Sequence, residues 1–486
     1  MMTSVMRRLL LLLLPAGLSA CGSLAPTDRP DMKIPAHYAA SPVSRDLPVA
    51  DGVGQHLSDG AASVPAWWRA YRNEALNALV TEGLAHNPSL EATRHSLLAA
   101  HDELRAQLGD TELPAVNVAF SPLRQRTLSM PGLPQETLQD TIYTADVSAS
   151  YSFNLAGATS LVNQGLAAKI AAQKWQLEAS QRALAANIVV TAINIASLQA
   201  QLDETAQLAD LGAQQARLAA LRYRLGSASQ SDMLAARQQA AELAAALPPL
   251  RAKVLALRHA EAVLLGRNPE DAPPPLTLDS LSLPTDLPMA LPSELLHRRP
   301  DILAAEAAVN AAAAQAGAAR AALFPTLSLT ASYGRGGFDW STFTSPAGLI
   351  WSAGASLTMP LFHGGALLAR KDEYRAEYDA AVQQYRQTVL DAFRSVADSL
   401  ADLEEDANRL EQATLAGEAA GQRRQNMMAR YQLGAVVFDD TLQAAQNDRN
   451  ARIRYLQART ARLADTATLF DAMGELPGET LGKPDF

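Results

Sequence analysis

Two stretches of the chain, residues 143–154 and 349–361, alternate apolar and polar residues one by one. A period of two sends alternate side chains to opposite faces of a β-strand, so the pattern predicts a strand at each stretch. Shorter alternating segments precede them at residues 116–120 and 327–333, and we expect these to be the partner strands. The chain therefore carries four predicted strands, each with one apolar and one polar face.

Strands of about ten residues with this alternation are typical of transmembrane β-barrels, in which one face meets lipid and the other meets water. Two soluble hairpins with one solvated face would show the same pattern. Four strands cannot close a membrane barrel, because the smallest barrels use about eight and an open edge in lipid leaves backbone groups unpaired. The barrel must then be shared between chains. Two chains would supply about eight strands and three about twelve, and the pattern does not choose between them.

The hydrophobic period is helical over residues 159–224 and 367–430, which contain no proline. Their leucines and isoleucines recur at steps of three and four residues, as in packed helices. At about 1.5 Å per residue the first helix would be about 100 Å long, which no soluble globular core requires. Each helix should turn at a Leu-Gly pair and return as a shorter helix, with Pro248-Pro249 interrupting the first return. Charged residues interleaved with alanine in the second helix are predicted to form a solvated face. They are Glu404, Glu405, Asp406 and Arg409.

The two halves of the chain repeat one unit. The turn that ends at Leu225-Gly226 matches the turn that ends at Leu433-Gly434 at an offset of 208 residues, and Asp232 matches Asp440 at the same offset. A constant offset indicates an internal duplication. We expect, in chain order, a signal peptide at residues 1–20, a lipidated extended tether at 21–64, a first structural repeat at 65–270, a Pro-rich linker at 271–292, a second structural repeat at 293–475 and a C-terminal tail at 476–486. The ordered part should begin near Trp67.

A short basic region, an apolar run and several small residues precede Cys21, the single cysteine of the chain. The apolar run is far shorter than the roughly 20 residues of a membrane-spanning helix, so it predicts a cleaved secretory signal. The tetrapeptide that ends at Cys21, Leu-Ser-Ala-Cys, resembles the bacterial lipobox, in which the cysteine is acylated. The alternative is a thiol that merely follows a signal peptide. Gly22 follows instead of aspartate, which by the usual sorting rule implies a lipoprotein of the outer membrane.

Composition excludes several classes of protein. The chain of 486 residues has 41 Lys and Arg against 50 Asp and Glu, and a net charge of −9 argues against a nucleic-acid binder. A single cysteine excludes a disulfide framework and Cys-rich zinc sites. The sequence holds no P-loop, no HExxH and no GxSxG motif, and its eight histidines are scattered. We therefore expect no enzyme activity, no metal and no cofactor beyond a covalent lipid.

Helical hairpins attached to membrane strands predict a fold that is mainly α with a small transmembrane β part. The shared barrel would continue into a long helical coiled-coil tunnel. The predicted function is a water-filled conduit through the cell outer membrane that extends into the periplasm. A non-conducting periplasmic scaffold lipoprotein is the alternative from another class.

Several runs resemble one known family. They are residues 67–79, 87–90, 291–302 (LPSELLHRRPDI), 305–306, 324–329, 360–365 and the two Arg-Tyr-x-Leu-Gly turns. Through these runs the chain resembles the outer-membrane efflux factors of the TolC type. More narrowly, it resembles the lipoprotein branch of that family in nodulation-type efflux systems. The resemblance extends from residue 67 to about residue 474.

This resemblance implies a homotrimer with a shared twelve-stranded barrel and a helical tunnel. It implies two further partners, a periplasmic adaptor (membrane fusion protein) and an inner-membrane efflux pump, usually of the resistance-nodulation-division type. The pump would supply the energy, and the tunnel would be a passive exit duct for drugs, metal ions or other small solutes. The exit tunnel of a protein-secretion system is the alternative within export.

Family members narrow the periplasmic end with acidic residues and with links between neighbouring helices. By motif, Asp440 falls on the acidic constriction, with Asp439 beside it, and Ser231 and Asp232 fall on a polar pair of the first hairpin. Phe438 is a candidate for an apolar ring, and the alternative is that it only packs at the helix tip. A ring of carboxylates would favour cations, whereas the alternative reading makes the two aspartates N-terminal caps of a helix.

At the gate, two positions depart from the family pattern. Val436 replaces a basic residue and Gln443 replaces a second acidic one, so the family's salt-bridge account of the gate is not transferred. The turns are expected to contact the adaptor, because they lie farthest from the barrel, although their glycines also suit a tight turn. The turn residues are Leu225, Gly226, Ser227, Leu433, Gly434 and Ala435.

Overall fold

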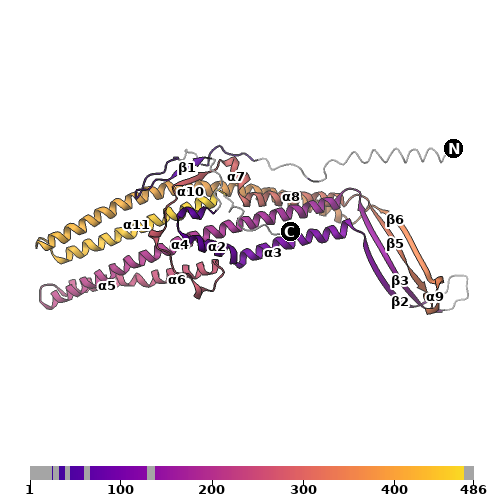
Figure 1. Cartoon of the computed structure of the whole chain (residues 1–486), viewed down its shortest axis with the longest axis horizontal. Coiled ribbons are helices and arrows are strands. Elements are labelled where there is room, and N and C mark those ends of the chain that lie inside the picture. The colour runs from indigo at the N-terminus through magenta and orange to yellow at the C-terminus, as the bar shows by residue number, and fades with distance from the viewer. Residues whose placement is uncertain (1–24, 26–31, 39–43, 60–65, 129–136, 475–486) are drawn as a thin grey trace. The chain divides into compact units, whose positions relative to one another are not determined.

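The computed structural model describes residue 25 and residues 32–38, 44–59, 66–128 and 137–474. The predicted signal peptide, Cys21 and the tail at 476–486 lie outside the described residues. The chain forms two compact units, and each unit combines segments that are distant in sequence (Figure 1). Unit 1 comprises Met1–Asp31, Ser96–Gln173 and Ala305–Arg386, and unit 2 comprises the remainder.

Unit 1 contains an antiparallel four-stranded sheet in the order β2-β3-β5-β6. The strands are β2 (Ala115–Leu128), β3 (Thr137–Asn154), β5 (Thr326–Gly337) and β6 (Leu349–Thr358). All four predicted strands are confirmed. β6, however, ends at Thr358 and not at residue 361, because Pro360 has no N–H to donate to a ladder. A short helix, α9 (Trp340–Thr344), and the turn η4 (Pro346–Gly348) join β5 to β6.

The strand register places the aromatic residues and most of the apolar residues of this sheet on one face. The pairs Val118↔Val147, Val147↔Tyr333 and Tyr333↔Trp351 form a continuous row across the four strands. The neighbouring row on the opposite face is Asn117, Ser148, Ser332 and Ser352. The hydroxyls of Ser332 and Ser352 lie 2.8 Å apart. Because pairing runs one to one over the whole length, with no bulge, the two faces never exchange.

Helical segments of unit 1 pack through small residues. Val309, Ala313 and Ala316 of α8 (Pro300–Ala321) contact Tyr378 and Val382 of α10 (Ala366–Gln432) in a buried cluster. A Cβ atom built on Gly165 of α4 (Ala158–Arg224) would lie 3.4 Å from the Cβ of Ala314, so glycine allows the two helices to approach closely. The small side chains of glycine and alanine therefore allow short distances between these helices.

Unit 2 contains most of the helical residues. The two long predicted helices are confirmed as α4 and α10, each of 67 residues. After its turn, α4 is followed by α5 (Gln230–Ala245) and α6 (Leu247–Leu264), which are separated at Ala246, just before the predicted Pro-Pro break. After its turn, α10 is followed by a single helix, α11 (Phe438–Ala472). The other helical elements of the chain are η1 (Trp67–Tyr71), α2 (Glu74–His86), α3 (Pro88–Glu112, most of which belongs to unit 1), η2 (Pro269–Asp271), η3 (Leu278–Ser280) and α7 (Pro292–Arg298). The mainly helical fold with a small β part is confirmed.

The ordered chain begins earlier than predicted. Residues 44–59, here called the strap, pack within unit 2, and β1 (His56–Asp59) pairs in parallel with β4 (Asp286–Met289). Leu47 and Leu57 of the strap are buried. Local periodicity does not reveal this arrangement, because the strap uses isolated apolar residues and a partner strand about 230 positions away in sequence. The linker also contributes β4, which the sequence did not predict.

A buried arginine holds the strap in place. Arg462 of α11 is only 1% exposed, and its Nε donates to the side-chain oxygen of Gln55 at 2.9 Å. Gln55 in turn donates through Nε2 to Pro284 O at 2.9 Å and to Thr466 Oγ1 at 3.1 Å. One glutamine thus connects the strap, the linker and α11.

We expect Gln55→Leu to lower the free energy of unfolding by about 1–3 kcal/mol, because a buried guanidinium loses its acceptor while the volume of the side chain is kept. Thermal unfolding of the purified protein measures the change. Gln422→Leu, on the exposed face of α10, is the control and should leave the midpoint almost unchanged. Equal midpoints for all three proteins would contradict the assignment.

Candidate functional site

The two Leu-Gly turns have the same backbone geometry. Gly226 and Gly434 both adopt φ of +74°, and the following N–H groups, of Ser227 and Ala435, donate back to Arg222 O and Arg430 O at 2.9 Å. This is the left-handed helix ending that glycine favours. Leu225 and Leu433 are 73% and 84% exposed. The predicted tips are therefore rigid turns that present an apolar side chain to solvent.

The polar pair of the first hairpin serves the start of α5. The Oγ of Ser229 accepts from the N–H of Asp232 at 3.1 Å, and the carboxylate of Asp232 accepts from the N–H of Ser229 at 3.1 Å. These two bonds form a capping box. Hydrogen bonds from the side chain and backbone of Ser229 lower the pKa of Asp232. Ser231 lies one residue before Asp232 in the first turn and is exposed.

The two aspartates of the second hairpin have different partners. Asp440 accepts from the N–H of Val437 at 3.3 Å, so it caps α11 as the alternative reading expected. Asp439 forms an ion pair with Arg222 at the end of α4. Phe438 is half-buried and packs on Tyr431, with ring centroids 5.4 Å apart. Gln443 donates to Asn447 within its own helix at 3.4 Å.

Arg222 was not identified from the sequence, although it supplies the basic partner that Val436 does not. It belongs to a row of polar contacts between α4 and α11, here called the polar seam. Its members are Ser197–Thr460 at 2.6 Å, Gln201–Gln457 at 3.0 Å, Glu204–Arg449 at 2.8 Å, Glu204–Arg452 at 2.9 Å, Gln215–Gln446 at 3.2 Å and Arg222–Asp439. Residue numbers rise along α4 as they fall along α11, so the helices are antiparallel. The signal in the sequence was Ser197, Gln201 and Glu204, polar residues at helical spacing within an apolar stripe.

The run LPSELLHRRPDI closes the far end of α11. Arg299 donates to both carboxylate oxygens of Asp301, at 3.0 and 2.7 Å, and its Nη1 donates to Ala472 O at 2.9 Å. Arg182 of α4 forms an ion pair with Asp471 at 3.2 Å. These arginines satisfy carbonyls that the end of a helix leaves free. The motif that carried the resemblance therefore has a structural task.

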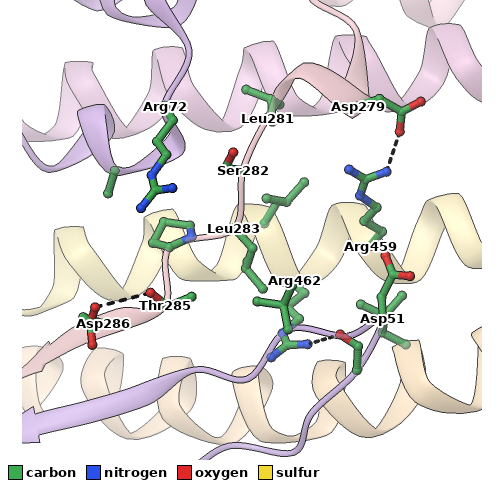
Figure 2. A pocket seen from close by; sticks show the side chains of 16 residues that line it. Asp51, Arg72, Asp279, Leu281, Ser282, Leu283, Thr285, Asp286, Arg459 and Arg462 are labelled. Atoms are coloured by element: carbon green, nitrogen blue, oxygen red, sulfur yellow. Dashed lines mark hydrogen bonds and ion pairs between the residues drawn. The ribbon is translucent and has the colours of Figure 1, made fainter.

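A cavity of about 540 Å³ in unit 2 lies between the strap, the linker and α11. Figure 2 shows Arg72, Arg459 and Arg462 around it. Arg459 pairs with Asp279 at 2.6 Å, and Arg462 donates to Ala50 O at 3.4 Å. Two of the three arginines are thus used to join segments. Within the described ranges, no group of three or more His, Cys, Asp or Glu residues is arranged to hold a metal ion.

Asp406 does not lie on the solvated face predicted for its neighbours. It is 8% exposed, and its Oδ2 is buried without a hydrogen-bond partner. Desolvation and the nearby Asp465 raise the pKa of Asp406 to about 7, against an opposing effect of Arg409. Leu403 and Leu410, which belong to the leucines that recur at helical spacing in this helix, precede and follow it in the sequence and are buried. The buried stripe of leucines on α10 is confirmed. Asp406 lies on the same side of the helix as these leucines, so its carboxyl group is buried with them.

The sheet of unit 1 bears an apolar band bounded by aromatic residues. Tyr151 and Phe153 lie at one end, with ring centroids 4.4 Å apart, and Tyr143 contacts Trp340 and Phe343 of α9 at the other. The ten residue steps from Phe153 to Tyr143 span about 33 Å along the strand, or about 25 Å across a bilayer at a typical barrel tilt. Val118 and Trp351, in the middle of the band, are 81% and 73% exposed. A band of this height between aromatic girdles fits the lipid-facing surface of a barrel.

One helix, α4, also contains a window apolar enough to cross a bilayer. However, 56% of that window is buried inside the protein. Ile188, Ile193 and Ile195 of this helix are at most 1% exposed. Its apolar residues are accounted for by core packing.

Comparison with known proteins identifies the family. The family model for outer membrane efflux proteins matches residues 79–266 and 291–475. OprJ of Pseudomonas aeruginosa, an outer membrane protein, is 30% identical over 487 residues and the match covers 95% of this chain and 94% of OprJ. The toluene efflux pump outer membrane protein TtgC of Pseudomonas putida is 28% identical, with 92% of this chain and 91% of TtgC covered.

The solved structure of the outer-membrane channel OprN superimposes with a TM-score of 0.80 at 26% identity, over 93% of this chain and 99% of that one. The chain belongs to the outer membrane efflux protein family. The resemblance derived from its motifs is confirmed, and so is its place in the outer membrane.

The raised pKa of Asp406 predicts a pH dependence. Because this folded-state pKa of about 7 exceeds the ordinary value of 3.8, the folded protein binds an extra proton between these pH values. The free energy of unfolding should fall as pH rises through that window, by at most about 1.4 kcal/mol per pH unit. Asp406→Asn should flatten this slope in chemical denaturation series. Glu418→Gln, on the exposed surface of α10, should keep it. A wild-type slope of zero or of opposite sign would refute the assignment.

Proposed function

We propose that this outer membrane efflux protein is the passive exit duct of a tripartite pump, assembled as a homotrimer and joined to a periplasmic adaptor and an inner-membrane pump. The observation that carries the proposal is the exposed apolar band on the sheet of a chain that belongs to this family. Its polar face, lined by Ser148, Ser332 and Ser352, would line the water-filled lumen.

The edges of the sheet support assembly from several copies. β2 and β6 are its edge strands, of 14 and 10 residues. In lipid each unpaired backbone group costs several kcal/mol, so β2 of one copy must pair with β6 of another. Three copies give about twelve strands, the number implied by the family resemblance. Closure by two copies remains the alternative that the oligomeric state of the purified protein tests.

The cargo is proposed as a drug, a solvent or another small solute. TtgC, which is similar along most of this chain, is named for toluene efflux. The conduit itself performs no chemical step in this proposal, and the inner-membrane pump supplies energy and selects the cargo. Co-purification of the pump would separate this function from the tunnel of a protein-secretion system.

Cys21 is proposed as the lipid anchor. It would carry acyl chains at the new N-terminus after removal of residues 1–20, and several chains hold a protein on a membrane more firmly than one. Mass spectrometry of the intact protein, with and without Cys21→Ser, distinguishes the lipoprotein from a chain with a free thiol.

The hairpin tips are proposed as the periplasmic aperture and the adaptor contact. Asp439, Asp440 and Phe438 of the second hairpin, with Ser231 and Asp232 of the first, would surround the narrow end. The ion pair between Arg222 and Asp439 would hold the two hairpins together in the closed form. The exposed Leu225 and Leu433, on rigid glycine turns, suit contact with an apolar groove of the adaptor. Gly226, Ser227, Gly434 and Ala435 complete these tips.

We expect Asp439→Ala with Asp440→Ala to raise single-channel conductance in planar bilayers and to weaken block by divalent cations, because the ring loses its carboxylates and the pair with Arg222 is broken. Arg222→Ala keeps the carboxylates, so it should raise conductance while the block persists. Glu418→Ala is the control and should behave as the wild type.

If both aperture variants conduct and block like the wild type, the aperture assignment is wrong. If the wild type shows no conductance at all, the scaffold alternative is favoured and the proposed function fails.

A further inference from the structure

Among the described residues, the most exposed large apolar side chains of unit 1 lie where β6 leaves the sheet. Leu361 and Phe362, in the turn between β6 and α10, are each 88% exposed. Gly364 and Gly365 follow them with φ of +58° and +80°, the left-handed conformation that glycine tolerates, and bend the chain into α10. The two neighbouring side chains offer a contiguous apolar surface to solvent, which indicates an interaction site.

A second apolar surface lies at the opposite edge of the same sheet, where α3 leads into β2. Leu113, in this junction, is 64% exposed. Beside it, a groove of about 770 Å³ runs between the end of α3 and the start of α4. The apolar side chains that line this groove are Leu104, Leu108, Tyr151, Phe153 and Leu155. The groove therefore suits a leucine or a phenylalanine from outside the chain.

The strand order brings these two surfaces close together only between copies. β2 and β6 are the edge strands, and every neighbouring pair in the sheet is antiparallel, so the end of β6 and the start of β2 lie at the same side of the sheet. Within one chain three strand spacings, about 14 Å, separate the two edges. In the proposed barrel, β6 of one copy would stand a single spacing, about 5 Å, from β2 of the next.

Lipid does not reach the turn after β6 in the proposed orientation. Leu357 pairs with Leu327, which pairs with Phe153 at the aromatic end of the band. Leu361 follows Leu357 by four residues, so it stands about 13 Å further along the strand direction, or about 10 Å along the membrane normal at a typical tilt. The headgroup layer is only about 5–8 Å thick. The surface that covers this turn is therefore protein and not acyl chain.

We propose that Leu361 and Phe362 of one copy pack on Leu113 and in the groove beside α3 of the next copy. This rests on the proposed function, which assembles the chain through β2 and β6. The contact joins the copies just outside the lipid, where burial of apolar surface removes it from water and is favourable. One phenylalanine contributes about 150–250 Å², a substantial part of the roughly 800 Å² that one partner supplies to a standard interface.

Chemical crosslinking of the full-length protein in membranes tests the contact. Leu113→Cys/Leu361→Cys, treated with a short bismaleimide, should give covalent dimers and trimers on denaturing gels, because the two cysteines meet between copies. Each single variant controls for reaction at Cys21 and should run as a monomer. Leu155→Cys/Phe324→Cys, at exposed positions beside the two central strands, should also run as a monomer.

Thermal dissociation of the purified assembly gives a second measurement. Phe362→Ala should lower the temperature at which the copies separate by several degrees, because its ring no longer fills the neighbouring groove. Tyr333→Ala is the matched control, since it removes an exposed aromatic ring from the middle of the lipid-facing band on a central strand. It should dissociate at the same temperature as the wild type.

If the double-cysteine variant gives only monomers while native mass spectrometry finds a trimer, the contact is wrong and the proposed assembly stands. Equal dissociation temperatures for the wild type and Phe362→Ala also overturn the contact, and they indicate that lipid or water covers the turn. A wild-type protein that is monomeric in native mass spectrometry overturns both the contact and the proposed homotrimer.

Discussion

Backbone hydrogen bonding in lipid is the constraint from which the rest of this structure follows. A strand that crosses a bilayer must pair every N–H and C=O, and the four strands of one chain pair with one another through an unbroken one-to-one register that leaves only the outer edges of β2 and β6 for another copy. The same register keeps most apolar residues on one face, because a shift by one residue would reverse both faces. In the proposed barrel, lipid contact, the polar lumen and the sharing of strands between copies would all be consequences of this single arrangement.

The helices solve a different problem, which is close packing over a great length with few large side chains. Glycine and alanine reduce the distance between helices, as at Gly165 against Ala314 and Gly212 against Ala240. Along the polar seam, α4 and α11 meet through hydrogen bonds and ion pairs. Such contacts depend on geometry more than apolar contacts do, so they define the register of two helices that small residues alone would leave free to slide. They also contribute less stability per contact than buried leucines.

Most charged residues singled out by family resemblance have a local structural task as well. Asp232 and Asp440 cap their helices, Arg299 closes α11, and Asp439 is held by Arg222. A role at the aperture is compatible with these tasks, since a cap or an ion pair also fixes the direction of a carboxylate. The duplicated position is instructive: Asp232 and Asp440 occupy the same place in the two hairpins and accept the same kind of backbone hydrogen bond.

The sequence by itself determined the features that depend on local periodicity. The four alternating strands and the two long helices repeat over neighbouring residues, and the glycine turns at Gly226 and Gly434 lie in short matching motifs, so all of them are visible along the chain. The family could be recognised for the same reason, from short contiguous motifs.

Only the tertiary structure decided which side chains meet. Arg222 and Asp439 are 217 positions apart, and Gln55 and Arg462 are 407 apart. The burial of Asp406 depends on which turn of α10 faces α11. The packing of the strap depends on its parallel pairing with β4, a strand from the linker. These contacts involve single residues with no local period, and their partners are chosen by the packing of whole helices, which is why the sequence alone did not reveal them.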